Sequence, residues 1–129
     1  MRHLTIRSAV LAALLAASFA APTAAWAVDG DAAAGKTAFN KCAACHAVQA
    51  GQNKVGPTMH GVFGRKAASV QGYAYSPAMQ KYDVVWDEGE LDKYLADPRG
   101  TVQGTKMVFP GIKSETERKN VIAYLETLK

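Results

Sequence analysis

The clearest periodic pattern of apolar positions lies at the C-terminal end of the chain. Apolar residues recur there at the three- and four-residue spacing of one helix face, at Val121, Tyr124, Leu125 and Leu128. The preceding residues 114–117, Ser-Glu-Thr-Glu, form a capping box, in which the Ser and the second Glu satisfy backbone N–H groups at a helix start. This pattern predicts a helix from the box to the end of the chain.

A second capping box predicts another helix upstream. Asp87 and Glu90 hold its two capping positions. Its apolar face consists of Leu91, Tyr94 and Leu95. Pro98 disfavours a helical backbone at the residue before it, so we expect this helix to end at Asp97.

The first predicted helix runs from Ala32 to Phe39, with Asp31 as its N-cap. Gly35 lies inside it, although glycine in a helix costs about 1 kcal/mol relative to alanine. Either this glycine is neutral, or another backbone passes close to it.

Directly after this helix, residues 42–46 read Cys-Ala-Ala-Cys-His and contain both cysteines of the chain. C-x-x-C-H is the pattern of c-type haem attachment. On one helical turn the Cys42 and Cys45 thiols project to the same side, where they can add to the two vinyl groups of one porphyrin. His46 then lies beneath the iron, for which an imidazole nitrogen is a good ligand.

Three other readings of the cysteine pair are a thiol redox couple, a zinc half-site and a structural disulfide. A zinc site needs further Cys or His ligands, and beyond residues 42–46 only His60 remains in the expected mature chain. A redox dithiol usually starts a helix beside a strand, and this chain has little strand signal. Haem attachment is therefore the favoured interpretation.

Residues 50–76 lose helical periodicity and are rich in glycine. So long an irregular stretch is uncommon in a small domain unless something other than secondary structure organises it. A flat haem with the chain wrapped around its edge would do so.

A second glycine-rich loop, predicted for residues 99–111, has an apolar centre. Met107 in this loop is the natural sixth ligand, because a thioether is soft and neutral. Met59 and Met79 compete with it, since chain reach from the cysteine motif excludes neither and methionine is far more often core filler than ligand. The residues alone leave this choice open.

Residues 1–27 have the pattern of an export signal that is cleaved from the mature protein. Ala9 to Ala21 form its apolar run, and residues 25–27, Ala-Trp-Ala, form a small-x-small cleavage site. A membrane anchor is the alternative, but the run is shorter than the roughly 20 residues of a spanning helix. We therefore expect a single domain, residues 28–129, in the periplasm.

The balance of charged residues limits which classes of binding partner we expect. The chain has 15 Lys and Arg against 11 Asp and Glu, and Arg2 and Arg7 belong to the expected signal, so the mature chain is only weakly basic. A nucleic-acid-binding protein would show a concentrated basic stripe with aromatic residues between the charges. We expect no nucleic-acid partner.

Residues 29–129 resemble the class I c-type cytochromes of the mitochondrial type, close to the soluble electron carriers of α-proteobacteria. The matching pieces are Gly35 and Phe39, residues 42–46, residues 56–66, Tyr75, Trp86, Tyr94 and Leu95, residues 104–109 and residues 123–125. The resemblance implies an all-α cytochrome c fold, with three main helices, further short ones and long loops wrapped around one covalently bound haem. It also implies that the first and last helices cross at Gly35, with Phe39 and Tyr124 in the same contact.

The same resemblance implies the site. His46 and Met107 become the axial ligands of the haem c held by Cys42 and Cys45, and Pro57 offers its carbonyl to His46 Nδ1. The other implied haem-binding residues are Arg65, Tyr75 and Trp86 around the propionates, Tyr94 and Thr105 around the sixth ligand, and Phe109 at the haem edge.

The function implied is that of a soluble, monomeric one-electron carrier and not an enzyme. Its donor would be a cytochrome bc-type complex or another protein, and its acceptor a terminal oxidase, a photosynthetic reaction centre or a reductase. The alternative is a peroxidase-like or gas-binding haem protein, which requires a labile Met ligand. Acidic redox partners, including membrane complexes in transient contact, would meet a positive ring of Lys41, Lys54, Arg99, Lys106 and Lys113. A merely solvated surface is the alternative for that ring.

Overall fold

The computed structural model describes residues 28–129, and the predicted signal segment lies outside the described residues. The helices are α1 (Ala32–Ala38), α2 (Pro77–Lys81), α3 (Glu88–Ala96), α4 (Pro98–Thr101) and α5 (Glu115–Glu126), with a 3-10 turn, η1 (Phe39–Lys41), after α1. Over this part of the chain the only extended pairing is an isolated antiparallel bridge between Lys66 and Val85. The predicted all-α class, with three longer helices and additional short ones, is confirmed.

Both capping boxes start helices where the sequence predicts them. Asp87 accepts a hydrogen bond from the Glu90 N–H at 2.8 Å at the start of α3. At the start of α5, Ser114 accepts from the Glu117 N–H at 3.2 Å. The last helix stops at Glu126 and does not continue to the end of the chain, since Thr127 leaves the regular pattern and its hydroxyl donates to the Tyr124 carbonyl.

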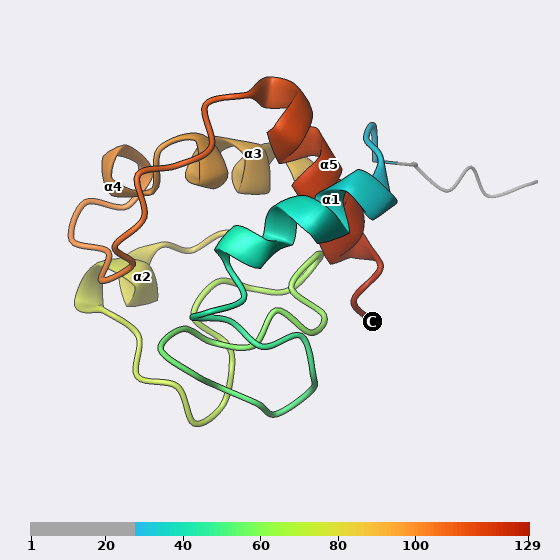
Figure 1. Cartoon of the computed structure of the whole chain (residues 1–129). Coiled ribbons are helices and arrows are strands. Elements are labelled where there is room, and N and C mark those ends of the chain that lie inside the picture. The colour runs from blue at the N-terminus through green and yellow to red at the C-terminus, as the bar shows by residue number, and fades with distance from the viewer. Residues whose placement is uncertain (1–27) are drawn as a thin grey trace, which may run out of the picture.

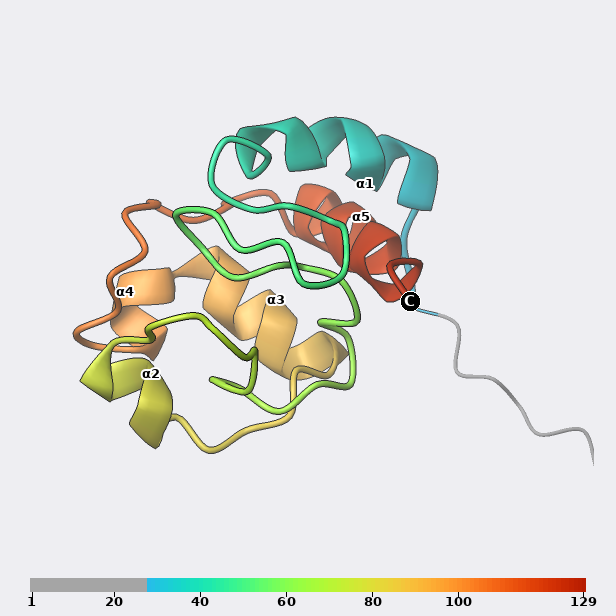
Figure 2. The same cartoon turned by 90° about the horizontal axis from the view of Figure 1, so that it is seen from below.

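The first and last helices lie against each other in both views of the molecule (Figures 1 and 2). A Cβ added at Gly35 would overlap the carbonyl oxygen of Asn120 on α5 and lie 3.0 Å from Tyr124 Cβ. The ring of Phe39 meets the Tyr124 ring edge-on, with 5.4 Å between centroids. The predicted helix crossing at Gly35 is confirmed.

The core lies between α5, α3 and the loops. On α5, Val121 and Ile122 are completely shielded from solvent, and Leu91 and Tyr94 on α3 face the same interior. Other buried apolar residues of this core are Phe39, Val62, Ala67, Met79, Trp86, Val102, Ile112 and Leu125. Residues 42–76 form loops that lie below α1, α3 and α5 in Figure 1.

The two shortest helices occupy stretches that the sequence did not assign to helix. Each starts with a proline at its first turn, after a residue whose side chain caps it, Ser76 for α2 and Asp97 for α4. The prediction of a continuous loop from Arg99 was therefore wrong for its first residues. None of the helices in residues 28–129 combines the length and the apolar character that a membrane crossing needs.

Candidate functional site

Residues 42–46 form one tight turn directly after η1. Backbone N–H groups of Cys45 and His46 donate to the Cys42 carbonyl at 3.0 and 2.9 Å. Cys42 is partly buried against the core, Cys45 is exposed, and the two do not form a disulfide with each other. One turn therefore carries two cysteine thiols and an imidazole, as covalent attachment of a single porphyrin requires.

His46 is held by the segment that follows. Its Nδ1 lies 2.8 Å from the Pro57 carbonyl oxygen, so Nδ1 donates and Nε2 keeps a lone pair for a metal. Burial lowers the pKa of His46, and the charges of Lys54 and Arg65 act in the same direction against the Pro57 bond. The imidazole is therefore held neutral and oriented, as an axial ligand must be.

Gly56 completes this support and is a residue whose role the sequence analysis missed. A Cβ there would lie 2.6 Å from Nδ1 and 2.8 Å from Nε2 of His46, so only glycine leaves room for the ring. Its N–H donates to the Cys45 carbonyl at 2.8 Å, which joins the two segments. In the sequence, the only indication of this role was the position of the glycine directly before Pro57.

The alternative readings of the cysteines find little support in this geometry. Burial raises the pKa of the Cys42 thiol, which outweighs the opposite effect of Lys41, whereas redox-active cysteines usually have a depressed pKa. Within residues 28–129, no group of three or more His, Cys, Asp or Glu side chains comes together as a metal cluster. A thiol redox couple and a zinc site therefore fit less well than haem attachment.

Two loops bring Arg65 and Trp86 together, as the resemblance implies. The Trp86 N–H donates to the Arg65 carbonyl at 2.9 Å, and the Arg65 guanidinium donates to the carbonyls of His60 at 2.7 Å and Thr58 at 3.0 Å. Burial lowers the pKa of Arg65. The guanidinium thus lies partly buried with fixed orientation, which suits a residue that binds carboxylates.

The Tyr75 side chain is anchored to the backbone of a neighbouring loop residue. Its hydroxyl accepts a hydrogen bond from the Val70 N–H at 3.2 Å. Burial raises the pKa of Tyr75, and the nearby charge of Arg65 opposes this rise. The phenol is therefore protonated and has a hydrogen left to donate.

The loop with Met107 is fixed at two points. The hydroxyls of Tyr94 and Thr105 lie 3.1 Å apart, and Thr105 also accepts from the Met107 N–H at 3.4 Å. On the other side, Lys106 donates to the Ala74 carbonyl and lies 4.5 Å from the centroid of the Tyr73 ring.

The three candidate methionines differ in their surroundings. Met79 is buried within the core on α2, whereas Met59 and Met107 are partly buried beside it. Met79 thus serves as core filler.

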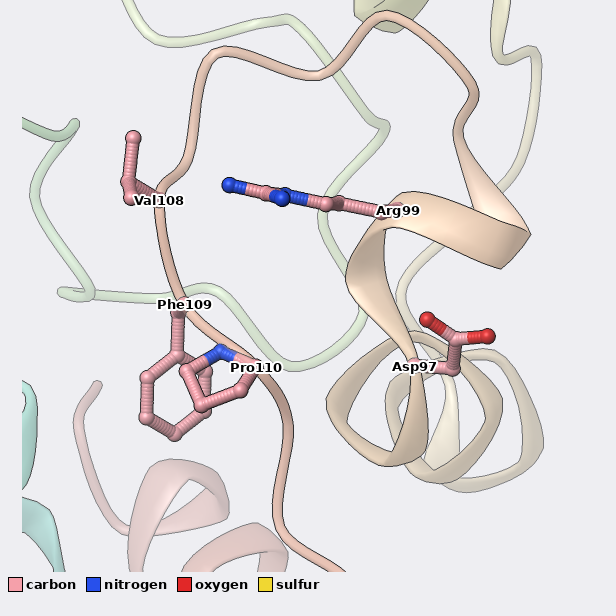
Figure 3. A pocket seen from close by; sticks show the side chains of 5 residues that line it. All are labelled: Asp97, Arg99, Val108, Phe109 and Pro110. Carbon is pink, nitrogen blue, oxygen red and sulfur yellow. The ribbon is translucent and has the colours of Figure 1, made fainter.

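Phe109, on the same loop, is partly buried and packs against the core. With Asp97, Arg99, Val108 and Pro110 it lines a pocket of about 160 Å³. Figure 3 shows the Arg99 side chain extending toward Val108, while Asp97 points away from it. Val108 is 85% exposed, so a positive group and an apolar side chain are presented to solvent together.

In the positive ring implied by the resemblance, the charge of one residue is offset by an ion pair. Lys41 forms an ion pair with Glu117, which offsets its charge. Lys54 and Lys113 instead donate to backbone carbonyls, of Ala43 at 2.6 Å and Ala96 at 3.3 Å, which carry no opposite charge.

A family profile, two related sequences and a solved structure all match this chain to cytochromes c. The sequence profile of the family described as Cytochrome c matches residues 32–129. Cytochrome c-550 of Nitrobacter winogradskyi is 50% identical over 97 residues, which are 74% of this chain and 89% of that protein. Cytochrome c2 iso-2 of Magnetospirillum fulvum is 50% identical over 91 residues, 70% of this chain and 95% of its own. The solved structure of cytochrome cH from Methylobacterium extorquens superposes with a TM-score of 0.72 at 50% identity, covering 76% of this chain and 99% of that one.

Proposed function

The chain belongs to the cytochrome c family, and from this we propose that it is a periplasmic one-electron carrier whose iron is held by His46 and Met107. The family binds haem c covalently, and Cys42 and Cys45 have the required spacing. The chain is an electron-transfer protein and not an enzyme. The haem supplies the chemistry, a one-electron change between ferric and ferrous iron.

The observation that carries the proposal is the fixed, neutral imidazole of His46 beside the two thiols. Its bond to the Pro57 carbonyl holds the ring in one tautomer and makes Nε2 a stronger donor. As the second protein ligand we assign Met107, whose loop Thr105 and Tyr94 hold by hydrogen bonds. Two protein ligands leave no position for a substrate, so electron exchange is the function that remains.

The residues around the cofactor have separate roles in this proposal. Arg65, Tyr75 and Trp86 would surround the haem propionates, and the permanently charged guanidinium of Arg65 would partly neutralise them. Tyr94 and Thr105 position the sulfur ligand, and Phe109 limits access of water to the haem edge.

The first prediction concerns export and attachment. Mass spectrometry of protein purified from the periplasm should find a chain that begins at Val28 and carries one haem, linked to Cys42 and Cys45. Cys42→Ala should retain haem through one thioether at most and with lower yield. Free thiols, a disulfide or an uncleaved signal in the mature protein would contradict this assignment.

We also propose that partners dock where Arg99 and Val108 are presented to solvent, near the Met107 loop. A positive group steers encounters with an acidic surface, and the exposed apolar side chain adds contact area after the encounter. The partners would be a cytochrome bc-type or other donor, and a terminal oxidase, photosynthetic reaction centre or reductase as acceptor.

The docking proposal gives a second prediction. Arg99→Glu should lower the bimolecular electron-transfer rate with an acidic partner at least several-fold at low salt. The effect should shrink as salt rises, because the screening length falls from about 10 Å at 0.1 M to about 3 Å at 1 M. Lys36→Glu, on the exposed side of α1, is the matched control and should change the rate little. Equal losses in both variants would show a general charge effect and no defined docking site.

A further inference from the structure

The peptide group between Pro57 and Thr58 is hydrogen-bonded at both of its ends. Its carbonyl oxygen lies 2.8 Å from His46 Nδ1 and accepts from it. The N–H of the same planar unit, which belongs to Thr58, donates to Asn53 Oδ1 at 3.1 Å. A single chain of hydrogen bonds therefore leads from the imidazole through this peptide to the Asn53 side chain, and both donors point toward Asn53.

The amide of Asn53 suits this position because it can accept and donate at once. Its Nδ2 donates to the Gln71 carbonyl at 3.0 Å, across to a loop 18 residues further along the chain. A carbonyl oxygen can only accept, so this bond requires the amide nitrogen on that side and leaves Oδ1 facing the Thr58 N–H. An aliphatic side chain at position 53 could make neither bond.

Thr58 is held at each of its polar groups, which fixes the peptide that precedes it. The residue is only 4% exposed. Its hydroxyl donates to the Gln49 carbonyl at 2.7 Å and accepts from the His60 N–H at 3.1 Å. Its carbonyl accepts from the Arg65 guanidinium at 3.0 Å. Because the residue cannot turn, the Pro57 carbonyl keeps its direction toward Nδ1.

We propose that Asn53 is a positioning residue for the axial histidine and sets how strongly His46 donates electrons to the iron. When the Thr58 N–H donates to Asn53, amide resonance shifts electron density onto the Pro57 oxygen, which becomes a stronger acceptor; hydrogen bonds linked in this way strengthen one another. A stronger acceptor at Nδ1 makes Nε2 a better electron donor. Better donation stabilises ferric iron more than ferrous iron, so the chain of bonds lowers the reduction potential. This inference rests on the proposed ligation of the iron by His46.

Asn53 differs in this respect from the charged residues that also influence His46. Lys54 and Arg65 act on the imidazole through their charges, which lower its pKa. Asn53 is neutral and acts through a continuous series of bonds. Since salt screens charges and not neutral hydrogen bonds, the effect of Asn53 on the potential should be the same at low and at high salt.

The experiment measures the NMR resonance and solvent exchange of the His46 Nδ1 proton in the reduced holoprotein, together with the reduction potential. In Asn53→Ala the resonance should move to lower frequency and the proton should exchange several-fold faster, because its bond to Pro57 is weaker. The equilibrium constant for reduction should rise roughly threefold, which is about 28 mV for a one-electron couple.

Asn120→Ala is the matched control for these measurements. Asn120 Oδ1 likewise accepts from a backbone N–H, that of Asp31 at 2.8 Å, but it does so between α5 and the start of α1. Its removal costs a bond of the same kind and should leave the Nδ1 proton and the potential at their wild-type values. Equal changes in the two variants would show a general loss of stability and would overturn the proposal, as would an unchanged Nδ1 resonance in Asn53→Ala.

If Asn53→Ala does not bind haem, Asn53→Asp decides the matter. This variant gives up the bond to Gln71 but keeps an oxygen for the Thr58 N–H, and its charge makes that oxygen a stronger acceptor. The Nδ1 resonance should move to higher frequency and the potential should fall, whereas an unchanged or lower frequency rejects the role of Asn53. Failure of the proposed ligation has a different signature: the His46 ring protons would then lack the large displacement caused by the haem ring current, in the wild type as well.

Discussion

Gly35→Val should destabilise the folded holoprotein by roughly 3 kcal/mol or more, measured as the free energy of unfolding in a denaturant titration. Even the Cβ atom would overlap the Asn120 carbonyl oxygen, and a backbone atom cannot move aside as a flexible side chain can. The two helices must then separate, which also loosens the contact between Phe39 and Tyr124.

Ala34→Val is the matched control for this prediction, because Ala34 is exposed on the same helix. Its cost should be limited to the lower helix propensity of valine, about 0.5 kcal/mol. If the two variants lost the same stability, the close crossing of α1 and α5 would not be what requires glycine at position 35.

Met107→Ala should produce the largest functional change. Methionine opposite histidine raises the potential of a cytochrome, so its loss should lower the reduction potential by on the order of 0.2 V, within the about 0.8 V that axial ligands span. The sulfur-to-iron absorption band of the oxidised protein should disappear. The vacated position should also let the reduced protein bind carbon monoxide, which the wild type should not do.

Two conservative variants serve as controls for the ligand assignment. Met59→Leu and Met79→Leu remove the competing sulfur atoms and nearly conserve side-chain volume. Both should keep the absorption band and a potential close to that of the wild type. Loss of the band in Met59→Leu, together with its survival in Met107→Ala, would move the ligand to the other loop.

Features that depend on neighbouring residues could be predicted from the sequence. The starts of α3 and α5 follow from the capping boxes at Asp87 and Ser114, where a side chain bonds an N–H three residues later. The C-x-x-C-H motif likewise lies within one turn. The helix crossing at Gly35 is an intermediate case, since the residues alone left a neutral glycine or a close backbone approach open and only the resemblance supplied the partner helix.

Features that depend on distant residues could not be predicted. Glu117, which pairs with Lys41, lies 76 residues further along the chain, so no local sequence pattern predicts this ion pair. Ala74 and Tyr73 restrain Lys106 in the same way across the loops. The short helices α2 and α4 contain too few residues for any periodicity, although Ser76 before Pro77 and Asp97 before Pro98 were usable signals.

A spectroelectrochemical titration of the purified holoprotein, with and without carbon monoxide, tests the central claim most directly. The proposed ligation by His46 and Met107 predicts one reversible one-electron transition, a sulfur-to-iron band in the oxidised form, and a midpoint potential that carbon monoxide does not change. A missing band, together with a midpoint potential that rises because carbon monoxide binds the reduced iron, would contradict the electron-carrier function and indicate an open, ligand-binding haem.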